Sequence, residues 1–134
     1  MSSKPVLLAL HYQNDVLHPD GKIRVGLTDD SKRTALIQAA GRLLAGARER
    51  DWPIVFVRIA FRPDYANMPA HMPIFQKTRE LGAVPEGQWG SDFYPELAPR
   101  ESPNELVVTH TAISSFYGTP LSQLLNMQIG RAHV

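Results

Sequence analysis

The stretch VLLALHYQND, residues 6–15, places five consecutive apolar residues directly before a polar cluster. The apolar run from Val6 to Leu10 shows no alternation with polar residues, so a strand formed from it must be covered on both faces, as in a parallel sheet flanked by helices. The run is too short for a buried helix. The polar residues from His11 to Asp15 fall where such a strand opens into a loop, which is where open α/β sheets place their ligands. We therefore expect this stretch to form the floor of a binding site.

The composition is typical of one globular domain. Of the 134 residues, 43% are apolar and 20% are charged. The formal net charge is only +1 and the Lys and Arg residues are scattered, which argues against nucleic acid or an anionic membrane as the partner and favours a small molecule. The chain has no cysteine, and its N-terminus lacks the pattern of a signal peptide. We therefore expect a cytoplasmic protein without disulfides.

A helix and a second strand follow the first strand. Thr28 to Ser31 form a helix entry with acidic residues near its positive end, and apolar residues then recur at helical spacing from Ala35 to Ala47. Ile54 to Val57 form a second run that is apolar on both faces, and we expect the chain to leave the sheet from Arg58 onward. Strand, helix and strand at this spacing predict a right-handed βαβ unit.

The second half of the chain is less regular. Residues 63–103 hold seven of the eleven prolines, so the only regular element expected there is a short helical turn near Pro73 to Leu81. A loop of this length is usually a lid, a binding loop or an oligomer contact. Leu106 to Thr109 form a third predicted strand, with His110 at its carboxyl end, and Thr119-Pro120 begins a further helix as cap and first residue.

Four blocks of the sequence, taken together, resemble the isochorismatase-like cysteine hydrolases. They are LLALHYQND at 7–15, PIVFVRIAFRPDY at 53–65, GQWGSDFYPELAP at 87–99 and VVTHTAISSFYGTPL at 107–121. The resemblance implies a doubly wound, Rossmann-like α/β/α fold with a parallel sheet. It also implies an oligomeric hydrolase that cleaves a small amide or, as in isochorismatases, a vinyl ether. We expect no cofactor.

The chemistry of that family rests on three residues. An aspartate after the first strand takes the proton of a thiol, a lysine after the third strand supplies positive charge, and a cysteine attacks the carbonyl carbon. This sequence departs at all three positions, because His11 stands in place of the aspartate, His110 stands in place of the lysine, and the 134 residues end before the cysteine. His11 and His110 are therefore the catalytic candidates.

Two interpretations of these histidines stay open. An imidazole can take a proton from a thiol near neutral pH, so His11 can replace the carboxylate as base. His110 replaces a lysine less well, because an imidazole is mostly neutral at pH 7 and its help to an oxyanion is weaker. The alternative is that both are hydrogen-bonded residues at strand ends, in a catalytically inactive homologue that acts as a binding or oligomerisation module.

Six further residues are candidates for binding the substrate, and each also has an ordinary structural explanation. Gln13 suits side-chain to backbone hydrogen bonds that fix the loop. Arg62 suits a substrate carboxylate, with an ion pair to Asp64 as the alternative. The aromatic candidates, which either wall a pocket or simply pack, are Phe61, Trp89, Phe116 and Tyr117.

A metal site is a further alternative, because imidazoles are common metal ligands. The candidates for a third contact beside the two histidines are His18, His71, Asp15 and Asp64, and their spacing favours none of them. The nicotinamidase branch of the superfamily binds metal through an aspartate followed closely by histidines after the second strand, whereas that loop reads FRPDYANMPAH here. We therefore expect no metal.

The last six residues, IGRAHV at 129–134, match the translation of a common sequencing adapter. We interpret them as a non-native tail without function. Residues 1–128 then form the N-terminal part of the family's domain, truncated at the C-terminus, with only its first three strands. Such a sheet has an uncovered edge, which predicts poor solubility or self-association.

Overall fold

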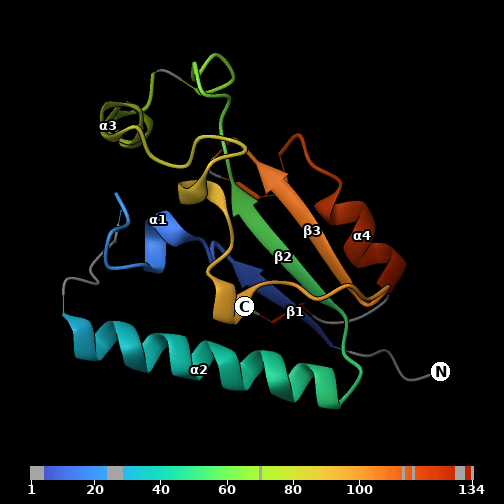
Figure 1. Ribbon diagram of the computed structural model, residues 1–134. Coiled ribbons are helices and arrows are strands. Elements are labelled where there is room, and N and C mark those ends of the chain that lie inside the picture. Colours follow the sequence, from blue (N-terminus) through green and yellow to red (C-terminus); the bar gives the residue numbers. More distant parts are fainter. Residues whose placement is uncertain are drawn as a thin grey trace.

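The computed structural model describes residues 5–23, 29–69, 71–112, 114–115, 117–128 and 132–133. A parallel sheet with the strand order β3-β2-β1-β4 forms its centre, and helices flank it, which confirms the predicted α/β fold (Figure 1). Within these residues, no helix combines the length and the apolar character needed to cross a bilayer. The strands are β1 (Val6–Leu10), β2 (Ile54–Ile59), β3 (Glu105–His110) and β4 (Ala132–His133), and the helices are α1 (Asn14–Leu17), α2 (Asp30–Glu49), α3 (Pro73–Leu81) and α4 (Leu121–Gln128).

Strand β1 is covered on both faces, as its unbroken apolar run predicts. On one face Leu7 lies in a buried cluster with Leu44 of α2. On the other face Leu8 lies in a second cluster with Leu121 of α4. Helices α2 and α4 therefore cover opposite faces of the sheet (Figure 1).

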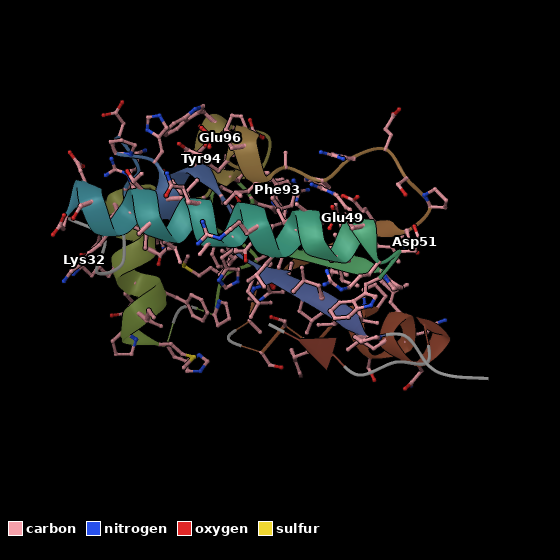
Figure 2. The ribbon with its side chains drawn as sticks, turned by 90° about the horizontal axis from the view of Figure 1, so that it is seen from below. Lys32, Glu49, Asp51, Phe93, Tyr94 and Glu96 are labelled. Carbon is pink, nitrogen blue, oxygen red and sulfur yellow. The ribbon has the colours of Figure 1, made fainter. Side chains whose placement is uncertain are left out.

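Helix α2 begins at the predicted acidic entry. The Asp29 side chain accepts a hydrogen bond of 2.9 Å from the backbone N–H of Ser31, and the hydrogen bonds with Ser31 lower the pKa of the Asp29 carboxyl. Asp30 stands in the first turn, where a negative charge meets the positive end of the helix. Lys32 and Glu49 lie near the two ends of this long helix (Figure 2).

Strand β2 is longer than predicted. Arg58 and Ile59 continue the ladder opposite Thr109 and His110 of β3, so the prediction that the chain leaves the sheet at Arg58 is wrong. Arg58 stays in the strand because its Nε donates a hydrogen bond of 2.7 Å to Thr109 Oγ1 on the neighbouring strand. A cross-strand polar pair at the end of a strand continues the ladder where the apolar pattern has already stopped.

The proline-rich segment is packed around one helix and two short 3-10 turns, η1 (Trp89–Ser91) and η2 (Pro95–Leu97). Helix α3 covers the residues predicted to form a helical turn, with Pro73 in its first turn and Gly82 (φ 64°) as its left-handed C-cap. Figure 2 shows Phe93 and Tyr94 beside α2, and both pack against the apolar cluster between α2 and the sheet. The segment is therefore anchored on the same face of the sheet as α2.

The sheet contains one strand more than expected. Ala132–His133 pairs in parallel with Val6 and Leu7 of β1, so the expectation of only three strands is wrong. The backbone of an outer strand can pair with β1 whatever its side chains are, because the ladder uses only main-chain groups. The interpretation of residues 129–134 as a non-native tail stays a prediction.

Candidate functional site

The two histidines lie at the same edge of the sheet. His11 follows β1 and His110 ends β3, and the three parallel strands β1, β2 and β3 end at this edge, where α1 and α3 also lie (Figure 1). Although β2 separates β1 from β3 in the sheet, the Nε2 atoms of His11 and His110 are 2.6 Å apart. The structure therefore brings together the two residues assigned as catalytic candidates.

The two rings meet end to end. The ring planes differ by only 14°. The ring centres are 4.9 Å apart and the two Nε2 atoms are 2.6 Å apart. The difference is about twice the distance from the centre of an imidazole ring to one of its atoms. The two nitrogens consequently lie between the rings on the line that joins them, and a single proton fits between them. Lone pairs that point directly at each other suit a shared proton better than a metal ion held by both nitrogens.

The hydrogen bonds define which nitrogens carry protons. His110 Nδ1 lies 2.6 Å from the carbonyl oxygen of Ala112, and a carbonyl only accepts, so this nitrogen carries a hydrogen. In the neutral ring His110 Nε2 is then an acceptor, and His11 Nε2 is the donor to it. The remaining nitrogen, His11 Nδ1, keeps its lone pair and makes no hydrogen bond to any described residue.

Burial keeps the pair uncharged. Removal from water lowers the pKa of His11 from 6.5 to about 4, and repulsion from His110, which acts when that ring is also protonated, adds to the shift. Burial also lowers the pKa of His110, and its hydrogen bond to the Ala112 carbonyl offsets only part of that shift. At neutral pH the pair is therefore neutral, and it carries no fixed positive charge of the kind that a lysine supplies.

The backbone at His11 has a left-handed conformation, with φ of 60°. Its N–H still donates to the carbonyl of Val57 at 2.8 Å, so the chain leaves the ladder immediately after this residue. Histidine, asparagine and aspartate are among the non-glycine residues that adopt this conformation most readily. The turn directs the imidazole toward β3.

Buried polar side chains fix the loops around the pair. Gln13 is fully buried, donates to the carbonyls of Ile59 (2.8 Å) and Ser91 (2.9 Å), and accepts from the N–H of Ile59 at 2.9 Å. These hydrogen bonds fix the loop, as the structural explanation for Gln13 describes, and a role of Gln13 in substrate binding stays a prediction. Asp15 accepts from the N–H of Val84 at 2.7 Å, and Val84 has a strained φ of 46°.

A cavity of about 700 Å³ opens beside His11. That volume lies within the range of ordinary small-molecule sites. Most of the described residues around it are apolar, and half of them come from α3. They are Leu10, His11, Val16, Ile23, Ile59, Ile74, Phe75, Lys77, Thr78 and Leu81.

The other substrate-binding candidates are not among the described residues that line this cavity. Phe61 is fully buried and packs edge-on against Phe75, with ring centres 5.7 Å apart, so it supports the wall from behind. Arg62 forms an exposed ion pair of 3.0 Å with Asp64, which is the alternative given for it. Trp89 and Tyr117 are exposed on the surface, and Phe116 lies outside the described residues.

Sequence reasoning missed the cavity wall that α3 provides. The helix itself was predicted, but its apolar residues gave no indication that they face His11. Lys77 was also missed, because one lysine on a short helix is an ordinary solvent-exposed residue. As for a metal, the part of the chain that the structure describes contains no group of three or more His, Cys, Asp or Glu side chains that could hold one.

Comparison with known proteins gives the family. The family model described as the isochorismatase domain matches residues 5–132. N-carbamoylsarcosine amidase from Thermoplasma acidophilum is similar in structure at 25% sequence identity and a TM-score of 0.68, over 92% of this chain and 61% of that one. The chain thus spans about three fifths of the length of this relative.

Two further solved structures are similar in fold. A cysteine hydrolase from Pseudomonas syringae pv. phaseolicola has a TM-score of 0.75 at 17% identity, over 98% of this chain and 60% of that one. Nicotinamidase/pyrazinamidase from Bacillus subtilis has a TM-score of 0.73 at 20% identity, over 95% of this chain and 67% of that one. At these identities the likeness concerns the fold alone. Because the family model matches almost the whole chain and the sheet has the same fold as these structures, the chain belongs to the isochorismatase family.

Proposed function

We propose that this protein is a hydrolase that cleaves a C–N bond of a small amide, with His11 and His110 in the places of the family's aspartate and lysine. The observation that carries this proposal is the 2.6 Å contact between the two Nε2 atoms, at the edge of the sheet and beside a cavity of suitable size. The similarity to N-carbamoylsarcosine amidase, at 25% identity, supports an amide as the substrate.

The pair can do the work of both residues that it replaces. His11 Nδ1 holds the free lone pair and accepts the proton of a thiol, and the charge of the resulting cation spreads through the Nε2 contact onto His110. The pair thus starts as a neutral base and becomes a cation beside the thiolate. The 134 residues contain no cysteine, so the proposal requires the thiol from outside them.

The low pKa of His11 sets a condition on this mechanism. A base with a pKa of about 4 is some four to five pH units weaker than an ordinary thiolate, whose pKa is about 8.5. Proton transfer therefore requires mutual stabilisation of the thiolate and the imidazolium, as in cysteine-histidine pairs in which the thiol pKa falls to about 3–4. The adjacent His110 supplies part of it by sharing the charge.

The test is ammonia release from a panel of primary amides and N-carbamoyl compounds by the full-length protein. We expect His11→Asn to lower kcat/KM by at least about 100-fold, because it removes the base while keeping a residue that accepts the left-handed backbone. The double variant His11→Asp with His110→Lys restores the family's residues and should recover much of the activity. Unchanged hydrolysis by His11→Asn would exclude His11 from the mechanism.

A second candidate function is a catalytically inactive homologue that serves for binding or oligomerisation. The observation that favours it is the neutrality of the pair, since both pKa values are lowered and neither ring supplies a fixed charge. In that case the wild type releases no ammonia from any compound in the panel. The His11→Asp, His110→Lys variant then shows whether the two histidines are the cause, because activity that appears only in this variant would mean that they are. Assembly into a homo-oligomer and a cytoplasmic location stay predictions, and sedimentation velocity tests the first of them.

A further inference from the structure

The cavity beside His11 has an uneven distribution of charge. Among the described residues around it, seven are aliphatic or aromatic, and the only ionisable side chains are His11 and Lys77. His11 is neutral at pH 7 because of its low pKa, so Lys77 is the single full charge. No carboxylate among these residues balances it.

Lys77 is available to a ligand. It lies on α3 on the same side as Ile74 and Leu81, which are three and four residues away and also line the cavity. Among the described residues its ammonium forms neither a salt bridge nor a hydrogen bond. Thr78, the neighbouring polar residue, already donates its hydroxyl to the carbonyl of Ile74 at 3.0 Å.

We propose that the cavity selects small amides whose apolar body carries an anionic group, with the amide at His11 and the anion at Lys77. This proposal rests on the proposed function for the orientation of the amide. An apolar wall with one cation favours such a ligand, because the wall covers the ligand body and no acidic residue among the described residues of the wall competes for the ammonium. A neutral amide of the same shape lacks the second contact.

The test is a pair of probes of matched shape, 3-carbamoylbenzoate and benzamide, whose dissociation constants are measured by calorimetry on the purified full-length protein. We expect the wild type to bind 3-carbamoylbenzoate about five- to tenfold more tightly than benzamide, the size expected of one exposed charge pair. Lys77→Met should abolish this preference without weakening benzamide, and Lys77→Glu should reverse it. The preference should also shrink as salt is raised from 50 to 500 mM.

Lys32→Met is the matched control. Lys32 is an exposed lysine near the beginning of α2 and does not line the cavity, so the variant removes one positive charge at a different place (Figure 2). Its probe affinities should equal those of the wild type. Equal affinity of the wild type for both probes, failure to bind either, or an equal loss in Lys32→Met and Lys77→Met would overturn the proposal.

Binding is measured apart from catalysis, so the two proposals fail in different ways. If the protein binds 3-carbamoylbenzoate selectively through Lys77 but releases no ammonia from any amide, the hydrolase is wrong and the anion subsite stands. If ammonia is released while the preference is absent or independent of Lys77, the hydrolase stands and the subsite is wrong.

Discussion

Gly90→Ala is expected to cost about 3 kcal/mol or more of the free energy of unfolding. A Cβ atom at Gly90 would lie 2.1 Å from Oδ2 of Asp15, which is far inside contact distance. Asp15 cannot move away cheaply, because its carboxylate is buried and accepts the N–H groups of Lys22 (3.2 Å) and Val84 (2.7 Å). Urea unfolding at pH 7 measures the loss.

Gly41→Ala is the matched control, because it adds the same methyl group where there is room. Gly41 lies within α2, and a new Cβ there would lie 4.0 Å from Leu97 Cδ2, which is ordinary contact distance. The substitution should stabilise the protein by about 0.5–1 kcal/mol, since alanine favours a helix over glycine. A similar small effect of both substitutions would contradict the close contact between Gly90 and Asp15.

A third variant isolates that contact. With Asp15→Ala in place, the carboxylate is gone, and adding Gly90→Ala should cost much less than it does in the wild type. Fully additive losses would place the cause elsewhere than in the Asp15 carboxylate.

Lowering the pH from 7 to 5 is expected to remove about 2 kcal/mol of the free energy of unfolding through His11 alone. Its pKa falls from 6.5 to about 4 on folding, so between these values the unfolded chain binds the additional proton and the folded state loses stability. The contribution is complete above pH 6.5 and is lost progressively as the pH falls toward 4. His110, whose pKa is also lowered by burial, changes stability in the same direction.

The His11→Asn variant provides the comparison, because asparagine does not titrate and accepts the left-handed backbone at this position. Urea unfolding of both proteins at pH 7 and pH 5 separates the His11 contribution from the general effect of acid. The wild type should lose about 2 kcal/mol more than the variant does. Equal losses would mean that His11 is not held neutral by folding.

The elements of the fold that could be predicted from the sequence are those that depend on local patterns. A few neighbouring residues are enough to predict each of these elements. They are the unbroken apolar run of β1, the acidic entry of α2 and the proline at the start of α3. β2 extends past its apolar residues because Arg58 pairs with Thr109 on another strand, and that partner is 51 positions away in the sequence. The short pairing of β4 with β1 is likewise a contact between distant parts of the chain.

The site was predictable in its residues but not in its geometry. Both histidines stand where parallel strands end, which is enough to expect them at one edge of the sheet. Their direct contact joins residues 99 positions apart across an intervening strand, and His11 makes it from a left-handed backbone conformation that the sequence does not announce. The sequence did not indicate that Lys77 lines the cavity, because this depends on which side of α3 faces His11.

The left-handed turn at residue 11 restricts which amino acids can occupy this position. Glycine, asparagine, aspartate and histidine adopt this turn most readily, whereas valine or isoleucine would be strained there, as Val84 is at its φ of 46°. In a saturation library at residue 11, these four residues should therefore be the most frequent among the most stable variants. Within that small group, aspartate and histidine are both proton acceptors. One can therefore replace the other as the base at residue 11 while the backbone keeps the same conformation.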